Sequence, residues 1–238
     1  FVNETAEMTN GTAYGENAVI TGITKDSRTV NKGDLFIALS GERFDAHDFV
    51  AQVAKSGAAA ALVERKLDVD IPQIVVKSTR LALGDFARAH CAKFDIPKVA
   101  VTGSVGKTTT RDLIASVLMA HYGSEFVLKT QGNYNNDIGL PFTVLGLEEK
   151  HRAAVIEMGM NHFGEISYLT NIVKPDIAVI TNAGTAHIEN LGSREGILKA
   201  KCEIFEGLKP NGTKVLNLDN DMLATVKGEN ILFYSINN

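Results

Sequence analysis

The sequence predicts an α/β protein in two parts: a small α/β domain over residues 1–78 and a mostly parallel, doubly wound domain over residues 79–238. Two observations predict the second part. Short apolar runs alternate with segments of helical periodicity, and a glycine-rich turn joins the first run to the first helix. The first part instead has short apolar runs separated by turns. With 45% hydrophobic residues, the chain can form at least one sizeable core.

In residues 1–78 we expect strands and turns around a single helix. Three strands are predicted, at residues 34–39, 58–63 and 73–76. Gly57 ends the helix, which is predicted by four apolar residues at helical spacing, Phe49, Val50, Val53 and Ala54.

The second part begins with a predicted helix at residues 79–94, which Pro97 separates from the first strand. Strands are expected at residues 98–101, 153–157, 176–180, 213–218 and 231–235. The helices that alternate with them are expected at residues 107–121, 163–173 and 193–208. Such alternation is typical of a parallel sheet, where ligands bind at the carboxyl ends of the strands. The polar residues that follow each strand are therefore candidates for a site.

Composition and charge exclude several classes of protein. The chain has 24 basic and 28 acidic side chains, a net charge of −4, which argues against nucleic-acid binding. No apolar run reaches the roughly 18–20 residues that span a bilayer, and no secretory signal opens the chain, so we expect a cytoplasmic protein that does not bind a membrane. Cys91 and Cys202 lack the spacing of a zinc site or a disulfide framework. No feature indicates a partner protein, and a monomer is expected.

A glycine-rich loop, TGSVGKTTT at residues 102–110, lies between the first strand and the first helix of this sheet. Its glycines let backbone N–H groups face an anion, the helix N-terminus adds partial positive charge, Lys107 can reach terminal phosphates, and a threonine hydroxyl can bind magnesium. The full eight-residue pattern requires glycine where Val101 stands, so only its compact core matches. The strand and helix on either side favour phosphate binding over an ordinary turn with a surface lysine.

Two later strand ends carry further candidates. Glu157 ends an apolar run, where a buried carboxylate needs a cation. Magnesium fits this position, although a basic side chain or a helix cap would also satisfy the carboxylate. His187 follows the next strand. A lone histidine is more often structural, but its place on the same rim as Lys107 and Glu157 favours a role in the site.

Helical periodicity separates the two lysines of the helix at residues 193–208. At about 100° per residue, Lys201 falls in the apolar arc with Ile197, whereas Lys199 falls on the polar face with Glu203. An inward ammonium is costly, so Lys201 needs a partner or chemical neutralisation. A lysine whose stem is buried and whose ammonium reaches water is the alternative.

The segment QGNYNNDIGLP at residues 131–141 groups side-chain amides with glycine and proline. Such a loop can offer hydrogen bonds to a ligand, and an ordinary asparagine-rich turn is an equal alternative on spacing alone.

These motifs together resemble the Mur ligases, ATP-dependent enzymes that form the amide bonds of the peptidoglycan stem peptide. TGSVGKTTT, NYNNDIGLPFTVL, VIEMGMNHFGEI, ITNAGTAHIENLGS and ILKAKCEIF occur in family order, and the resemblance covers nearly the whole chain. Residues 26–63 resemble the family's uridine-nucleotide domain. The asparagine segment and EMGMNHFGEI follow the pattern of the members that add D-alanyl-D-alanine.

The resemblance implies roles for individual residues around ATP and magnesium. Lys107 and Thr108 are implied to bind the ATP phosphates and one magnesium ion, in a loop shaped by Gly103, Ser104, Gly106 and Thr109. Glu157 and His187 are implied to bind magnesium, and Lys201 matches a lysine that the family carbamylates to form a further magnesium ligand. Asn135 and Asn136 are implied to line the ATP site.

The resemblance also implies the substrates. UDP-N-acetylmuramoyl-tripeptide is implied to contact six residues of the first domain, Ser27, Arg28, Gly41, Glu42, Arg43 and His47. ATP would activate its peptide carboxylate as an acyl phosphate, which the amine of D-alanyl-D-alanine attacks. The implied catalytic residues are Lys107, Glu157, His187 and Lys201.

Several alternatives stay open at this point. One is a tripeptide-forming Mur ligase, and another is a non-catalytic module that binds the UDP-sugar and ATP. Folylpolyglutamate synthase is disfavoured by the uridine-nucleotide segment, and a switch GTPase by the lack of an NKxD segment. The family has a third, C-terminal domain that these 238 residues do not include, so an inactive fragment is expected.

Overall fold

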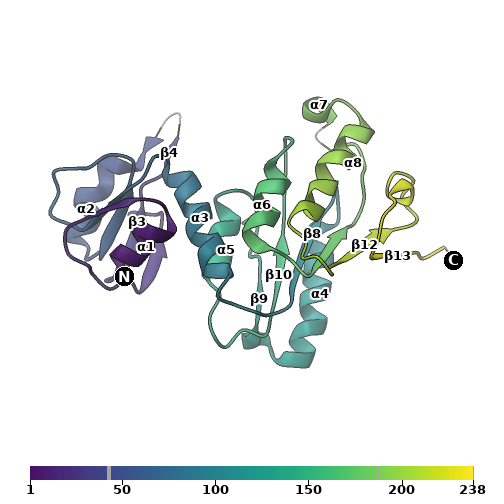
Figure 1. The fold of residues 1–238 in the computed structure, drawn as a ribbon, viewed down its shortest axis with the longest axis horizontal. Helices are drawn as coiled ribbons and strands as arrows, with labels where there is room; N and C mark the ends of the chain where they lie inside the picture. The colour runs from purple at the N-terminus through teal and green to yellow at the C-terminus, as the bar shows by residue number, and fades with distance from the viewer. Residues whose placement is uncertain (42–43, 187, 238) are drawn as a thin grey trace. The chain divides into compact units, whose positions relative to one another are not determined.

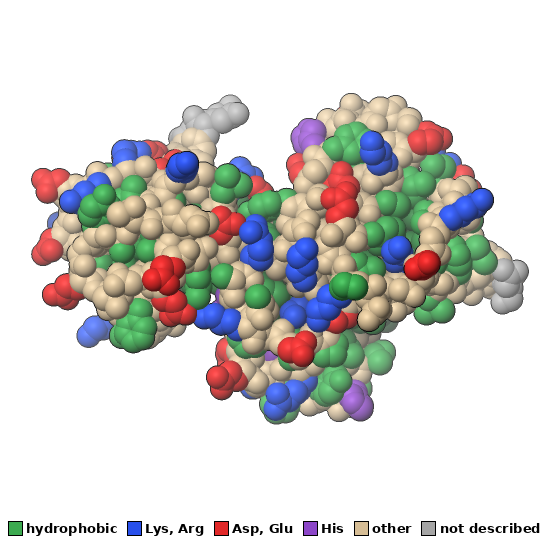
Figure 2. Space-filling model, in the orientation of Figure 1, with side chains coloured by type: hydrophobic (Ala, Val, Ile, Leu, Met, Phe, Trp, Pro, Cys, Tyr) green, Lys and Arg blue, Asp and Glu red, His purple; other side chains and the backbone are tan. Residues whose placement is uncertain are grey.

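The computed structural model describes residues 1–41, 44–186 and 188–237. It has two compact units, Phe1–Ala89 and His90–Asn238, and helix α3 (Thr79–Cys91) contributes residues to both (Figure 1). The predicted fold class is confirmed, because each unit holds a mostly parallel sheet with helices packed on it. Acidic and basic side chains both occur on the face drawn in Figure 2. None of the described helices is long and apolar enough to cross a membrane.

The sheet of the first unit has the strand order β1-β7-β6-β3-β2. Only β1 is antiparallel to its neighbour. The strands are β1 (Thr12–Tyr14), β2 (Gly22–Thr24), β3 (Asp34–Ile37), β6 (Ala60–Val63) and β7 (Gln73–Val75). A separate antiparallel pair consists of β4 (Ser40–Gly41) and β5 (Phe44–Asp45).

The helices of the first unit are α1 (Val2–Met8), a 3-10 turn (Ala46–Phe49) and α2 (Val50–Lys55). Helix α2 packs on the sheet through Val50 and Val53, as the helical spacing predicts. The prediction of a single helix was wrong, because α1 also forms. Helix α1 is short and buries only one turn of small side chains, so its periodic signal is weak.

The sheet of the second unit is entirely parallel, in the order β13-β12-β11-β8-β10-β9. Its strands are β8 (Lys98–Thr102), β9 (Val127–Lys129), β10 (Ala153–Glu157), β11 (Ile177–Ile180), β12 (Thr213–Asn217) and β13 (Ile231–Tyr234). From β8 the chain passes to β9 at one edge, returns to β10 and then crosses to β11 on the other side of β8. This reversal beside β8 is the place where ligands bind in such sheets.

The helices of the second unit cover both faces of this sheet. They are α4 (Lys107–Tyr122), α5 (Gly139–Leu145), α6 (Glu165–Val173), α7 (Ile188–Leu191) and α8 (Arg194–Cys202), with 3-10 turns at Ser124–Phe126, Glu203–Glu206 and Leu223–Thr225. The connections through α4 and α6 run in opposite directions along the sheet, so right-handed crossovers place the two helices on opposite faces. Helix α4 packs through Ala115 and Leu118 on the buried valines of β8, β10 and β11.

One strand, β9, and two α-helices, α5 and α7, of this unit were not predicted. Helix α5 begins inside the predicted loop, and Pro141 lies in its first turn, where the missing N–H has no partner within the helix. Helix α6 begins later than predicted because Gly164 takes a left-handed conformation, with φ of 84°. Helix α8 ends at Cys202 and continues as a 3-10 turn instead of running to residue 208.

Candidate active site

The phosphate loop, residues 103–106, turns the chain from β8 into α4, and two of its glycines are required by geometry. Gly106 has φ of 80°, in the left-handed region that side chains with a Cβ rarely adopt. Gly103 lies against the end of β11, where a Cβ would overlap the hydroxyl of Thr181. Glycine is therefore required at position 106 by the backbone conformation and at position 103 by the close approach of Thr181.

Lys107, the first residue of α4, folds back over the phosphate loop. Its Nζ donates hydrogen bonds to the carbonyl oxygens of Gly103, at 2.8 Å, and Ser104, at 3.4 Å. Burial lowers the pKa of this lysine, and the charge of Glu157 opposes the shift. An ammonium that is partly removed from water beside a helix N-terminus is suited to a phosphate.

The end of β11 fixes the phosphate loop from the other side. The backbone N–H groups of Ser104 and Val105 donate to Oδ1 of Asn182, at 3.0 and 3.1 Å. The Thr181 hydroxyl donates to the carbonyl of Val105 at 2.7 Å, and the N–H of Gly184 donates to Oγ of Ser104 at 3.0 Å. Sequence reasoning gave Thr181 and Asn182 no role, because their loop partners lie more than 70 residues away.

Glu157 ends β10 as a buried carboxylate with a relative exposure of 1%. Its Oε2 accepts from the Thr108 hydroxyl at 3.0 Å, and its Oε1 accepts from the side-chain amide of Asn135 at 2.8 Å. The Glu157 backbone N–H donates to Oγ1 of Thr130 at 2.9 Å. The carboxylate is thus held at the rim beside the first turn of α4.

Sequence reasoning missed Arg111, which is also buried and lies 3.2 Å from Oε2 of Glu157 through its Nη1. The pairing of Glu157 with a basic side chain, one of the alternatives for this carboxylate, is therefore present. A signal existed, because Arg111 lies four residues after Lys107 and so on the same face of the helix.

Lys201 is buried in α8 with a relative exposure of 1%, whereas Lys199 is exposed. The prediction from helical periodicity is confirmed. Burial, with a smaller contribution from the charge of Lys107, lowers the pKa of Lys201 to about 7. A lysine with this pKa is largely a neutral amine in mildly alkaline solution.

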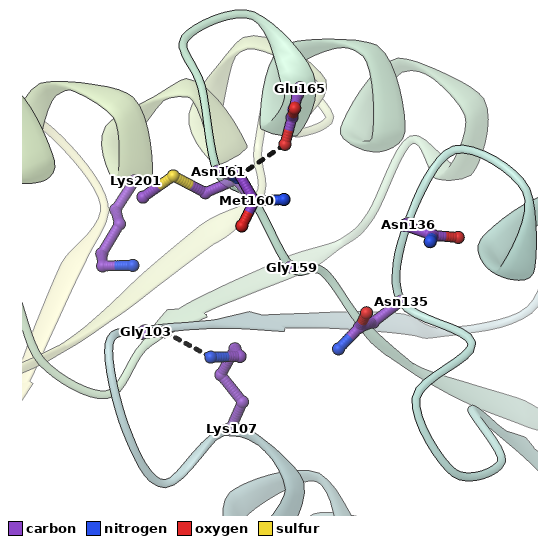
Figure 3. A pocket seen from close by; sticks show the side chains of 9 residues that line it. All are labelled: Gly103, Lys107, Asn135, Asn136, Gly159, Met160, Asn161, Glu165 and Lys201. Carbon is purple, nitrogen blue, oxygen red and sulfur yellow. Dashed lines mark hydrogen bonds between the residues drawn. The ribbon is translucent and has the colours of Figure 1, made fainter. Parts of the chain in front are cut away.

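Some of these residues line a cavity of about 210 Å³ at the carboxyl ends of β8 and β10. Figure 3 shows Lys107 and Lys201 entering it from different elements, with Asn135 opposite. The lining residues are Gly103, Lys107, Asn135, Asn136, Gly159, Met160, Asn161, Glu165 and Lys201. Two lysines and the start of a helix make the cavity suitable for an anion.

The two predicted asparagines use their side chains differently. Asn135 hydrogen-bonds Glu157. Oδ1 of Asn136 accepts the N–H groups of Ile138, at 3.2 Å, and Gly139, at 2.8 Å, and so begins α5. Both asparagines line the cavity, whereas the side chain of Thr109 is exposed.

The described residues offer two oxygen donors for a hard cation, the Thr108 hydroxyl and the Glu157 carboxylate, whose facing oxygens lie 3.0 Å apart. The described part of the chain holds no group of three or more His, Cys, Asp or Glu residues that could bind a metal. His187 lies outside the described residues. As an ammonium, Lys201 would repel a cation, whereas its carbamate would supply further oxygen donors.

In the first unit, the predicted substrate residues lie in two segments. Arg28 is exposed and binds Asp26 through two hydrogen bonds, of 2.8 and 2.6 Å. These bonds lower the pKa of Asp26 to about 2. Ser27, beside them, is half-buried.

His47 lies in the second of these segments, and its side chain is fully buried. Its Nδ1 lies 2.5 Å from Oδ1 of Asp45, and its Nε2 accepts the N–H of Glu64 at 2.8 Å. This arrangement gives the imidazole a structural role, and its contact with a substrate stays a prediction. Gly41 ends β4, whereas Glu42 and Arg43 lie outside the described residues.

Comparisons with known proteins agree with this geometry. Residues 101–238 match the Mur ligase middle domain, and residues 19–91 match the family described as "Mur ligase family, catalytic domain". The chain is 44% identical to the UDP-N-acetylmuramoyl-tripeptide--D-alanyl-D-alanine ligase of Escherichia coli K12, over 92% of this chain and 48% of that protein.

Two solved structures are similar over almost all of this chain. MurF from Acinetobacter baumannii superposes with a TM-score of 0.92 and 40% identity, covering 98% of this chain and 52% of that one. MurF from Thermotoga maritima, solved in complex with ADP, gives a TM-score of 0.82 and 35% identity, covering 94% and 52%. The chain spans about half the length of the curated relatives it matches.

Proposed function

Because this chain belongs to the Mur ligase family, we propose that it is the part of an ATP-dependent ligase that binds UDP-N-acetylmuramoyl-tripeptide and the ATP phosphates. The complete enzyme would join D-alanyl-D-alanine to this tripeptide and release ADP and phosphate. The observation that carries the proposal is the cavity lined by Gly103 and Lys107 of the phosphate loop and by the buried Lys201. Asn135, which also lines it, hydrogen-bonds the buried carboxylate of Glu157. The names of the similar proteins support the choice of D-alanyl-D-alanine as second substrate.

In the proposed reaction the peptide carboxylate and the triphosphate must approach each other although both are anions. Lys107 and the backbone N–H groups at the start of α4 would hold the terminal phosphates and offset this repulsion. Gly103, Ser104, Gly106 and Thr109 would shape that loop. Magnesium, held by Thr108, Glu157 and His187, would neutralise phosphate charge during the transfer. The acyl phosphate formed on the peptide is then attacked by the dipeptide amine.

Lys201 would act as a carbamate in this scheme. Its lowered pKa leaves a neutral amine near pH 8, which can attack carbon dioxide. A nitrogen–carbon bond forms, the nitrogen loses a proton, and the product is an anion. Such an anion would attract Lys107 instead of repelling it. Carbamylation would therefore remove the cost of placing two positive charges at one cavity.

The remaining assignments concern the substrates and the setting of the protein. Asn135 and Asn136 would line the ATP site. UDP-N-acetylmuramoyl-tripeptide would contact the first unit at Ser27, Arg28, Gly41, Glu42, Arg43 and His47. We further assign the protein to the cytoplasm as a monomer, with small molecules rather than nucleic acid or membrane as its ligands, because both proposed substrates are small polar molecules.

A ligation assay on the complete protein that carries this chain tests the proposal. Mixtures with ATP, magnesium, UDP-N-acetylmuramoyl-tripeptide and D-alanyl-D-alanine should yield the UDP-linked pentapeptide by mass spectrometry, with equal amounts of ADP. Lys201→Ala should abolish product, whereas the matched control Lys199→Ala, on the exposed face of α8, should not. Product formed only from the UDP-linked dipeptide and a single amino acid would instead identify the tripeptide-forming activity. ATP binding without any product would favour a non-catalytic module.

A further inference from the structure

Arg111 is a buried cation that the proposed mechanism does not use. Its relative exposure is 4%, and its Nη1 donates to Oε2 of Glu157 and to the carbonyl of Gly132, both at 3.2 Å. The Gly132 carbonyl belongs to the loop that carries Asn135, whose amide donates to the other carboxylate oxygen. Arg111 therefore joins α4, this loop and the end of β10.

The other edge of the guanidinium is held by a second carboxylate. Nε and Nη2 of Arg111 lie 2.9–3.1 Å from the carboxylate oxygens of Asp112. Asp112 in turn accepts from Nζ of Lys129 at 2.8 Å. A planar guanidinium can bond two carboxylates in this way, whereas a lysine ammonium cannot present the same fork. The hydrogen bonds to Asp112 therefore fix the orientation of the Arg111 guanidinium toward Glu157.

The contact matters because of which oxygen it uses. Oε2 of Glu157 accepts hydrogen bonds from both the Arg111 guanidinium and the Thr108 hydroxyl. The carboxylate of Glu157 and the hydroxyl of Thr108 are also the two oxygen donors suited to a hard cation. A buried carboxylate without a cation would be costly, and Arg111 removes this cost. A cation that binds the same oxygen must do so beside the fixed positive charge of Arg111, which opposes it.

We propose that Arg111 is a positioning residue that stands in for the metal at Glu157. It keeps the Glu157 carboxylate in place when no cation is bound. Its positive charge also lowers the affinity of the site for magnesium, so that magnesium can leave with the product nucleotide. This inference rests on the proposed function, because it assumes that Glu157 binds magnesium.

The test measures magnesium binding through stability rather than through turnover. The thermal unfolding midpoint is followed while MgCl2 is titrated at fixed ADP, with ionic strength held constant by NaCl. In Arg111→Met the unfolding midpoint without magnesium should fall, and the Mg²⁺ concentration for half-maximal stabilisation should fall by about tenfold or more. Arg111→Lys keeps the charge and should stay within about threefold of the wild-type concentration. Arg88→Met, which removes an exposed arginine paired with Asp85, is the matched control and should leave the magnesium response unchanged.

Two further variants make the result decisive. Adding Glu157→Gln to Arg111→Met should remove the gained magnesium response, because the carboxylate is the proposed ligand. If Arg111→Met is unfolded without magnesium, Arg111→Gln, which is neutral and can still donate a hydrogen bond, should show the same shift. An unchanged or weaker magnesium response in both neutral variants would overturn the inference. So would a gain in Arg111→Lys as large as that in Arg111→Met, or a gain that survives Glu157→Gln.

The outcomes also separate this inference from the proposed function. A wild-type magnesium response that depends on Glu157 but is unchanged in both neutral Arg111 variants would overturn the role of Arg111 and leave the proposed metal site standing. A response that appears only in Arg111→Met and depends on Glu157 would still support the role of Arg111. No response in any variant would overturn both.

Discussion

Replacing Lys201 by methionine should change how stability depends on pH. The pKa of Lys201 is lowered from 10.5 to about 7 in the folded chain, mainly by burial. Between these values the unfolded chain binds one more proton than the folded chain, so the free energy of unfolding rises with pH across this window. For Lys201 alone the rise from pH 6 to pH 9.5 is about 3 kcal/mol, and the contribution is lost as pH falls through about 7.

Methionine has a similar length and no charge, so Lys201→Met should not show this rise. Relative to the wild type, the variant should be more stable at pH 6 than at pH 9.5, by the same amount of about 3 kcal/mol. Urea denaturation of both proteins at the two pH values measures the difference, and comparing the two proteins cancels the titration of other groups. The buffers must be free of bicarbonate, since carbamylation of the wild type would mask the effect. Lys199→Met, on the exposed face of the same helix, is the control and should track the wild type.

A stability difference between Lys201→Met and the wild type that is equal at both pH values would refute this reasoning. It would mean that the ammonium is solvated in the folded chain or paired with an acid, and that desolvation does not govern its pKa.

Two other substitutions test the phosphate loop. Gly103→Ala should lower the free energy of unfolding by about 1–3 kcal/mol, because the new Cβ overlaps the Thr181 hydroxyl. Gly132→Ala, where φ is 49° but the space is open, should cost only about 1 kcal/mol in the same urea titration, and equal costs would argue against the overlap. Asn182→Ala removes the side-chain acceptor of the Val105 N–H, whereas the Ser104 N–H keeps the backbone carbonyl of residue 182, and the change should weaken binding of a fluorescent ATP analogue by about tenfold. Unchanged affinity would show that the loop keeps its shape without Asn182.

Some of the site could be predicted because it depends on short-range pattern. The phosphate loop is defined by residues that are adjacent in sequence, and Glu157 by its place at the end of an apolar run. The inward direction of Lys201 follows from the 3.6-residue period of one helix. Each of these predictions needs only the local chain, and for that reason the fold class and the burial of Lys201 were confirmed.

The remaining contacts of the site depend on which strands become neighbours in the sheet. Hydrophobic periodicity does not predict the order of the strands. Arg111 reaches Glu157 across 46 residues, and Asn182 reaches the phosphate loop across more than 75, because β10 and β11 flank β8. Helix α1 of the first unit was missed because its seven residues give too short a periodic signal. His47 shows a different limit of sequence reasoning, since its full burial and the engagement of both its ring nitrogens depend on residues that the local pattern does not identify.

Calorimetric titration of this chain with UDP-N-acetylmuramoyl-tripeptide, compared with the corresponding UDP-linked dipeptide, tests the central claim most directly. We predict that the tripeptide binds more tightly than the dipeptide and that Arg28→Ala abolishes the binding, whereas the control Arg88→Ala does not. Tighter binding of the dipeptide, or tripeptide binding that is unaffected by Arg28→Ala, would contradict the proposed substrate and its site.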